Sequence, residues 1–278
     1  MNYATLSRAP LDTFLIVNAD DLGRSSAINQ GVISAFTHGI VTSTSLMVNF
    51  PAFAEAADLV LRHHLPVGIH FNLTEGHPVL PSHKISSLID DQGCFWPKNH
   101  FISRWFSRRL KSAEICCELQ AQVQKCLDLN LRLDHFDSHH HIHGLPRLGN
   151  LFHQVALQFG IVRCRFVSRA AWSMPLYYQL QQQTVYWANR WVKKMEVKHP
   201  DYFYGFEWMH LHAKEETLLR LIAELPQGIS ELMCHPSAAT EKSVSKLGNR
   251  VKELEALCSS VVKDAVNQVV PISFEDLR

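Results

Sequence analysis

Short apolar runs alternate with stretches of helical periodicity along most of this chain, and that order limits the fold more than any other feature. The first run covers residues 14–17, and apolar side chains at positions 28, 32, 35 and 36 then follow at the spacing of one helix face. Similar runs recur at 45–48, 67–71, 133–136, 162–167 and 231–234, separated by helical faces at 53–63, 115–127, 148–159 and 218–225. Such alternation is typical of parallel strands joined by crossover helices, as in an α/β barrel or a doubly wound sheet.

Composition narrows the class of protein. Hydrophobic residues make up 46% and charged residues 19% of the chain, which fits a globular protein with a sizeable core. No repeat or flexible linker divides the sequence, so we predict a single domain over residues 1–278, with its core motifs between about 14 and 236. The 27 basic and 26 acidic side chains nearly balance, which argues against nucleic acid or an anionic membrane as partner. We expect a small-molecule partner and leave a homodimer open.

The seven cysteines and the first residues of the chain indicate the cellular compartment of the protein. The cysteines form no Cys-x-x-Cys pair and no regular framework, which favours a reducing compartment. The first ten residues lack the charged leader and long apolar run of a secretory signal. No segment approaches the roughly 18 apolar residues of a membrane span. We therefore predict a cytoplasmic enzyme with no transmembrane segment.

Two adjacent carboxylates, Asp20 and Asp21, come directly after the first apolar run. Such a pair repels itself unless a cation or a shared proton relieves the repulsion. The plain structural interpretation is a turn followed by a helix N-cap. The functional interpretation is that the two carboxylates face a metal ion.

Histidines follow three other apolar runs. His70 ends the run at 67–71, His235 follows the run at 231–234, and a cluster of four histidines lies within 139–143. If the chain stayed extended there, alternate side chains would share one face and could coordinate a metal; these are Asp137, His139, His141 and His143. A lone histidine is more often a hydrogen-bonded structural residue, and histidine tracts also occur as surface loops.

Four strand ends thus deliver aspartate, histidine or both. In β/α barrels the loops after the strands converge on one face, where active sites are built. The joint pattern therefore predicts a metal-dependent hydrolase. Spacing alone leaves other amidohydrolases and metal phosphoesterases open, although the sequence has no glycine-rich phosphate loop.

Five sequence blocks resemble the YdjC-like carbohydrate deacetylase family, which includes chito-oligosaccharide deacetylases and a relative associated with hopanoid biosynthesis. The blocks are LIVNADDLG at 15–23, GIVTSTS at 39–45, GIHFNLT at 68–74, DSHHHIH at 137–143 and CHP at 234–236. They occur in family order and span most of the chain. Leu22 stands where an aromatic residue is usual, which affects local packing and leaves the acidic pair intact.

The resemblance implies an α/β fold, a distorted β/α barrel with parallel strands and helical crossovers. It also implies one divalent ion, Mg or Zn, held by Asp21, His70 and His139, with Asp20 as catalytic base. An acid has to protonate the leaving amine, and we predict His235 for this role before a member of the cluster at 139–143. The other interpretation of His235 is a residue that orients a metal ligand. We further predict that the substrate contacts Asn72, Asp137, His141 and His143.

The implied reaction is hydrolysis of the acetamide of an N-acetylated sugar to amine and acetate. The substrate is a chito-oligosaccharide or a glycolipid precursor. A metal-stabilised sugar-binding protein without catalysis is the non-enzymatic alternative. Two aromatic-rich stretches, 95–106 and 172–208, fit the alternation poorly. We expect both to be insertions over one end of the barrel, where their aromatic residues pack locally or form a wall on which a sugar stacks.

Overall fold

All strands of the sheet run parallel in the computed structural model, which describes residues 12–168, 196–210, 213–240 and 249–278. Within those ranges the sheet has the order β4-β3-β2-β1-β6-β5, and β7 pairs with β1. The strands are β1 (Thr13–Leu22), β2 (Ser43–Leu46), β3 (Val67–Phe71), β4 (Leu133–Ser138), β5 (Tyr202–Tyr204), β6 (Gly228–Cys234) and β7 (Val270–Pro271).

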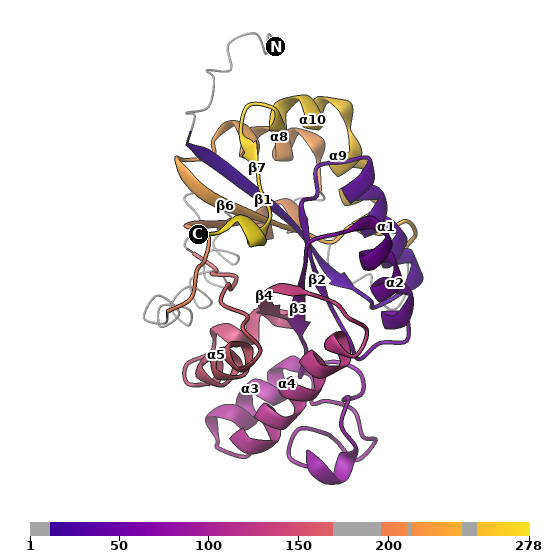
Figure 1. Ribbon diagram of the computed structural model, residues 1–278, viewed down its shortest axis with the longest axis vertical. Coiled ribbons are helices and arrows are strands. Elements are labelled where there is room, and N and C mark those ends of the chain that lie inside the picture. Colours follow the sequence, from indigo (N-terminus) through magenta and orange to yellow (C-terminus); the bar gives the residue numbers. More distant parts are fainter. Residues whose placement is uncertain (1–11, 169–195, 211–212, 241–248) are drawn as a thin grey trace.

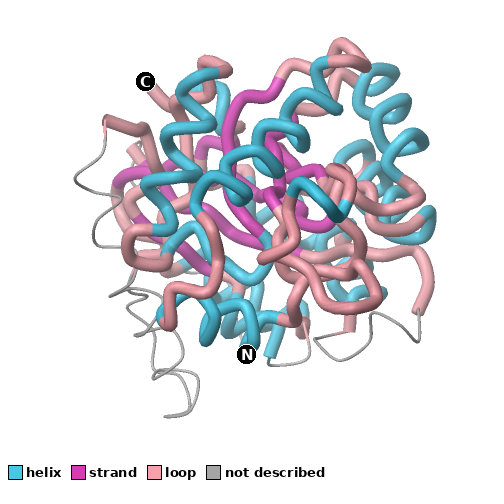
Figure 2. Tube along the Cα trace, turned by 90° about the horizontal axis from the view of Figure 1, so that it is seen from below, coloured by secondary structure: helices cyan, strands magenta, loops and turns pink. Residues whose placement is uncertain are grey.

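Helices connect the strands and surround them (Figure 2). The α-helices are α1 (Ser26–Thr37), α2 (Phe53–His63), α3 (Lys98–Phe106), α4 (Ser112–Leu127), α5 (Leu148–Gln158), α7 (Phe206–His210), α8 (Glu215–Ala223), α9 (Arg250–Cys258) and α10 (Ser260–Val266). Short 3₁₀ turns are η1 (Ser82–Lys84), η2 (His139–Gly144) and η4 (Phe274–Asp276). Helix α1 packs against α2 and α9, and α4 packs against α5 on the opposite side of the molecule (Figure 1).

The barrel closes through single bridges rather than through a full strand. A parallel bridge joins Phe136 of β4 to Cys164, and another joins Arg163 to Lys198. The chain then continues into β5, which pairs with β6. The predicted distorted β/α barrel of parallel strands is therefore confirmed. The prediction of a regular strand at 162–167 is wrong, because this segment forms only those isolated bridges.

The apolar patterns that predict helices in the sequence correspond to buried helix faces in the structure. Helix α1 begins after Ser25, whose side chain accepts a hydrogen bond from the Ile28 amide at 3.3 Å, and its apolar residues Ile28, Val32 and Ala35 are fully buried. Along α4 the predicted face is also buried, although its last member, Leu127, is exposed. These side chains belong to one large apolar cluster that joins the helices to the sheet.

Helix α4 also carries two buried polar side chains that hold the chain after β3. Gln122 pairs with the backbone of Asn72, accepting from its N–H at 3.1 Å and donating to its carbonyl at 2.7 Å. Glu118 accepts from the amides of Val79 and Leu80 at 2.9 and 3.0 Å. These contacts satisfy backbone groups that would otherwise be buried without partners. The loop that follows β3 is therefore held in place by side chains of α4.

The two aromatic-rich stretches have different outcomes. In 95–106 the residues Phe95, Phe101 and Trp105 are buried, which confirms local packing as their role. Trp172 lies outside the described residues, as does the rest of 169–195. The end of the second stretch is no insertion, because 202–204 form strand β5 of the sheet itself. All seven cysteines are free, and within the described ranges no helix is long and apolar enough to cross a membrane.

Candidate active site

Strand register brings the predicted residues together at the carboxyl ends of the strands. Ala19 of β1 pairs with Cys234, the last residue of β6, so Asp20 and His235 each directly follow one of these two paired residues. His70 of β3 pairs directly with Asp137 of β4. Because parallel strands end at the same edge, these side chains and those that follow them share one face of the barrel.

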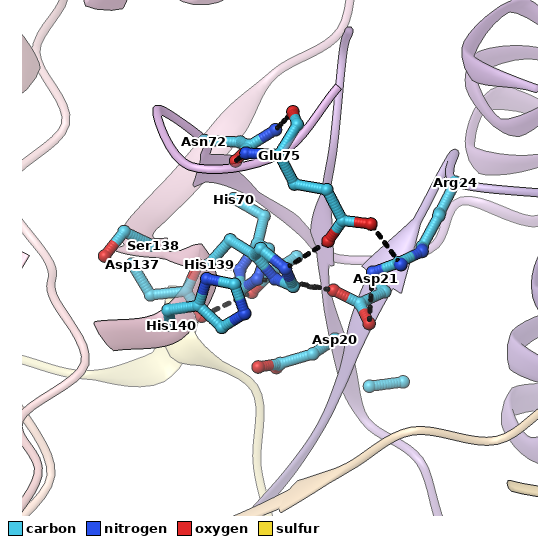
Figure 3. A network of polar contacts seen from close by, with 12 residues as sticks. Asp20, Asp21, Arg24, His70, Asn72, Glu75, Asp137, Ser138, His139 and His140 are labelled. Carbon is cyan, nitrogen blue, oxygen red and sulfur yellow. Dashed lines mark hydrogen bonds and ion pairs between the residues drawn. The ribbon is translucent and has the colours of Figure 1, made fainter. Parts of the chain in front are cut away.

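Asp21, His70 and His139 form a buried group with the geometry of a metal site (Figure 3). Asp21 Oδ1 lies 3.2 Å from His139 Nδ1 and 3.6 Å from His70 Nε2. Ligand bonds of about 2.0–2.1 Å at tetrahedral angles would place such atoms roughly 3.3 Å apart, so the separations fit a bound ion. Arg250 Nη2 donates to Asp21 Oδ2 at 2.6 Å and leaves Oδ1 as the oxygen that faces the two imidazoles.

The backbone at Asp21 separates the two adjacent carboxylates. Asp21 has φ 68°, in the left-handed region that residues other than glycine seldom adopt. Gly23 follows at φ 91°, where an added Cβ would lie 2.4 Å from the Met47 carbonyl oxygen. Residues held in such conformations cluster at functional sites. The turn directs Asp21 towards the imidazoles, whereas Asp20 contacts an arginine.

Charge in the Asp21 group is balanced within the site. Burial alone would raise the pKa of the Asp21 carboxyl, but Arg250 and then His139 lower it well below its usual range. Burial lowers the pKa of His139, whereas the Asp21 carboxylate and Glu75 raise it more strongly, to about 9. His139 is therefore the cation of this pair at neutral pH. A divalent cation bound there would replace that proton.

Arg165 holds a second, fully buried cluster of three carboxyl groups. Its Nη1 and Nη2 donate to the two oxygens of Asp20 at 2.7 and 2.6 Å, and its Nε donates to Glu231 at 2.6 Å. Its Nη1 also lies 2.7 Å from Asp137 Oδ2. Burial raises the pKa of Glu231 to about 7, with Asp20 and Asp137 adding to the rise against the opposing effect of Arg165. Three acidic groups thus share one guanidinium.

Asp137 is fully buried and contacts other site residues. Its Oδ1 lies 2.7 Å from His70 Nδ1, and its Oδ2 accepts from Ser45 Oγ at 3.1 Å. A carboxylate that receives the second N–H of a ligand histidine fixes that imidazole's tautomer and orientation. These contacts are those of a positioning residue. Its predicted contact with substrate stays a prediction.

Asn72 is also fully buried, and its side chain shapes the loop after β3. Its Oδ1 accepts from the amides of Thr74 and Glu75 at 3.0 and 3.1 Å, and its Nδ2 donates to the Glu75 carbonyl at 2.7 Å. Nδ2 also donates to Asn49 Oδ1 at 3.1 Å. The side chain therefore holds this loop, and its predicted substrate contact stays untested.

The extended face predicted for the histidine cluster is wrong. Strand β4 ends at Ser138, and the chain then turns through His140 and His141, which have φ 59° and 55°. Ser138 Oγ closes the turn by accepting from the His143 amide at 2.9 Å, a local side-chain bond that competes with extended structure. His139 alone of the histidine tract therefore joins the group around Asp21.

The other members of the cluster have separate surroundings. His141 contacts the rings of Phe203 and Phe206 edge to face, with centroids 5.8 and 5.0 Å away. His143 Nδ1 lies 2.7 Å from Ser138 Oγ, and burial lowers its pKa to about 4. Burial likewise lowers the pKa of His141 well below its usual value. Both imidazoles are thus neutral near pH 7, and their predicted contacts with substrate stay predictions.

His235 lies beside the acidic pair, on the loop after β6. Its amide donates to Glu253 Oε2 at 2.5 Å, and its buried Nδ1 has no hydrogen-bond partner among the described residues. Burial, followed by the charge of Arg250, lowers the pKa of His235 to about 4. Burial raises the pKa of Glu253 to about 7. His235 is therefore a neutral imidazole with a free nitrogen near Asp20 and Asp21.

Comparison with known proteins identifies the family of this chain. The sequence model of the family described as YdjC-like protein matches residues 14–268. The chain belongs to the YdjC-like family. It is 34% identical to a chitooligosaccharide deacetylase of Yersinia enterocolitica over 93% of this chain and 96% of that protein. It is 30% identical to a carbohydrate deacetylase of Thermoanaerobacter pseudethanolicus over 84% of each chain.

A solved structure has the same fold. The putative cellobiose-phosphate cleavage protein of Enterococcus faecalis is 27% identical and superposes with a TM-score of 0.77. The match covers 95% of this chain and 98% of that one. The barrel of this YdjC-like protein is thus found in a solved relative along almost its full length.

Sequence reasoning missed the arginines and the glutamates of this YdjC-like site. Arg165 had a readable signal, since it stands inside the apolar run at 162–167, where an unpaired charge would be costly. Glu75 directly follows the block at 68–74. Arg24 had no distinctive pattern, although its guanidinium contacts Glu75 and lies 3.8 Å from Asp21 (Figure 3). Arg250 reaches Asp21 from a part of the chain 229 residues away.

Proposed function

We propose that this chain is a metal-dependent carbohydrate deacetylase, which hydrolyses the acetamide of an N-acetylated sugar to an amine and acetate. The observation that carries the proposal is the buried group of Asp21, His70 and His139 with Asp20 beside it. An oxygen of Asp20 and a nitrogen of His70 lie within 4.8 Å of each other, and Asp20 directly precedes Asp21 in the chain, which supports a base close to the proposed ion. The names of the YdjC-like relatives support the substrate class.

The donor set suits a divalent cation that accepts nitrogen and oxygen ligands. Two imidazoles and one carboxylate are typical of zinc, whereas magnesium prefers oxygen, so we place zinc before magnesium. When bound, the ion would polarise the acetamide carbonyl and lower the pKa of a water molecule. Asp21, His70 and His139 would hold it.

Asp20 would take the proton from the attacking water. Its oxygens accept from Arg165 and from Asn18 Nδ2, at 2.9 Å for the latter, and a carboxylate has about four lone-pair sites, so one remains for water. The new bond joins the water oxygen to the acetyl carbon, and the bond from that carbon to nitrogen then breaks. Arg165 keeps the carboxylate of Asp20 aligned throughout.

The departing amine needs a proton, and His235 is our candidate to supply it. Because the pKa of His235 is about 4, its imidazole starts neutral and has to gain a proton before it can donate one. The proton that Asp20 removes from water is the available source. One proton would thus pass from water through Asp20 and His235 to the nitrogen.

A direct assay tests the proposal. Purified protein is treated with chelator, supplied with Zn²⁺ or Mg²⁺, and incubated with diacetylchitobiose or with a phosphate ester. We expect acetate release that the chelator abolishes and the ion restores. Phosphate release without acetate would instead indicate a phosphoesterase, and sugar binding without either product would indicate a binding protein. A glycolipid substrate in place of diacetylchitobiose tests the second substrate class.

The cytoplasmic location of the protein stays a prediction.

A further inference from the structure

Both ring nitrogens of His139 face a carboxylate. Nδ1 lies 3.2 Å from Asp21 Oδ1, and Nε2 lies 2.9 Å from Glu75 Oε2. Figure 3 shows the imidazole between these two acidic side chains. A neutral imidazole has one unprotonated nitrogen, which can bind a metal, and one N–H, which can donate a hydrogen bond. The two carboxylates therefore have different roles towards His139.

His70 has the same arrangement with its nitrogens exchanged. Its Nε2 lies 3.6 Å from Asp21 Oδ1, and its Nδ1 lies 2.7 Å from Asp137 Oδ1. Each histidine thus presents one nitrogen to Asp21 and the other to a second acidic residue, which is Asp137 for His70 and Glu75 for His139. His70 uses Nε2 towards Asp21, whereas His139 uses Nδ1.

We propose that Glu75 is the positioning residue of His139, as Asp137 is of His70. By accepting the Nε2–H of His139, Glu75 keeps a proton on that nitrogen, so that Nδ1, beside Asp21 Oδ1, is the nitrogen that gives up its proton to an ion. Metal-binding histidines commonly donate their second N–H to such a partner, and loss of the partner lowers metal affinity. The inference rests on the metal site proposed above, and it assigns a role to a residue outside the ligand set.

Glu75 is itself held in place. Its backbone carbonyl accepts from Asn72 Nδ2 at 2.7 Å and from Asn49 Nδ2 at 3.2 Å. Arg24 donates to Glu75 Oε1, which leaves Oε2 for His139. The side chain of Glu75 is 35% exposed, whereas that of Asp137 is fully buried. After substitution of Glu75, Arg24 and His139 still face Asp21, at 3.8 and 3.2 Å, so the variants are expected to fold.

A rival role for Glu75 is direct metal binding. Ligand atoms of Glu75, His139 and His140 also lie within 4.8 Å of one another. In that arrangement His139 Nε2 would bind an ion instead of donating to Glu75. His140 Nδ1 already lies 3.0 Å from Thr74 Oγ1, and Glu75 is already paired with Arg24, so we prefer the positioning role. A ligand role predicts that loss of Glu75 lowers the number of bound ions, whereas the positioning role predicts the same number with weaker binding.

Metal titration of the apo full-length protein tests the proposal without reference to catalysis. Zn²⁺ and Co²⁺ are titrated into the wild type, Glu75→Ala, Glu75→Gln and the control Glu55→Ala, whose carboxylate contacts Ser26 at the start of α1. We expect one ion per chain in all four proteins. We expect Glu75→Ala to bind about 10 to 100-fold more weakly and to change the visible Co²⁺ spectrum. Glu75→Gln should recover most of the affinity, because its amide oxygen still accepts the Nε2–H.

Two outcomes would overturn the assignment. Wild-type affinity and an unchanged Co²⁺ spectrum in Glu75→Ala would show that Glu75 does not position His139. One ion fewer in both Glu75 variants than in the wild type would make Glu75 a ligand. Failure of the proposed function is a separate result: if the wild type binds one ion and Glu75→Ala binds it weakly, the positioning role stands even when no acetate is released.

Discussion

Asp20 and Asp21 are neighbours in sequence, yet they belong to two clusters of opposite character. Asp21 faces two imidazoles, and its oxygen Oδ1 is available to an ion. Asp20 is bound through both oxygens by the fully buried Arg165. In the first cluster Arg250 binds one oxygen of Asp21, and the other oxygen faces a cation that can be exchanged, a proton or a metal. The second already contains its cation as a covalent part of the chain.

This difference shows how one strand end can hold two adjacent acidic side chains. The left-handed backbone at Asp21 directs the side chains to different partners, so neither depends on the other for neutralisation. The carboxylate that would take the proton of water is held through both oxygens by Arg165, and the carboxylate that would bind the ion is left open on one oxygen. The following variants test whether the two clusters are as separate as this comparison implies.

The largest effect is expected from Arg165→Met. This change removes the only guanidinium bonded to Asp20 and Glu231 among the described residues and leaves several buried acids without compensation. Removal of one partner from a buried ion pair costs about 3 to 5 kcal/mol of unfolding free energy. Urea denaturation measures the loss. The control is Arg132→Met, whose partner is the surface residue Glu275, and exposed pairs contribute about 0 to 1 kcal/mol.

Equal losses in the two arginine variants would show that the buried cluster does not stabilise the fold. A loss in Arg165→Met that disappears at low pH would agree with the structure. At low pH the freed carboxyl groups take up protons, and the repulsion among them then ends.

Asp20→Asn is expected to lower kcat by about 10² to 10⁴-fold, or roughly 3 to 5 kcal/mol of barrier, because the amide cannot accept the proton of water. Metal stoichiometry should stay at one, since the ligand set lies on the other cluster. Acetate release and Zn²⁺ titration on the same preparation check both statements. Loss of the ion in this variant would make Asp20 a ligand, and full activity would remove it as the base.

His235→Ala separates an acid from a residue that orients the metal site. If His235 protonates the amine, hydrolysis of an acetamide should slow far more than that of an acetate ester, whose leaving group needs less help. If His235 only orients a ligand, both substrates should slow alike and metal affinity should fall by about 10 to 100-fold. We expect the first pattern, measured as kcat/KM for the two substrates. Parallel losses with weaker metal binding would contradict it.

Sequence patterns were sufficient for the elements whose burial follows a simple period. The apolar run at 67–71 and the helical face at 53–63 coincide with β3 and α2, because each buries side chains at the spacing its pattern shows. The strand prediction for 162–167 was wrong because Arg165 within this run bonds to acidic residues on other strands. The segment is positioned by these ion pairs and forms only isolated bridges in place of a regular β-ladder.

For the site, sequence reasoning identified the residues that lie on the strand ends and in the family blocks. It placed Asp21, His70 and His139 in one set, and the structure brings them together. It could not find the contacts that depend on tertiary packing, such as Arg250 to Asp21. It also assumed that the chain stays extended after β4, whereas the side chain of Ser138 closes a turn there. Periodicity does not report such local side-chain competition.

The smallest effect concerns the exchangeable cation itself. His139 has a pKa of about 9 in the protein without metal, because the Asp21 carboxylate and Glu75 outweigh burial. A metal that binds to His139 Nδ1 has to displace one proton at any pH below about 9. Apparent affinity should therefore rise with pH, by about tenfold per unit, and level off near pH 9. Zn²⁺ titrations between pH 6 and 8 measure this slope, and proton release into two buffers of different ionisation heat counts the protons. His139→Gln should remove this slope along with most of the affinity. An affinity independent of pH in the wild type would mean that His139 is already neutral before the ion arrives, and the Asp21 cluster would then resemble the permanently compensated Asp20 cluster.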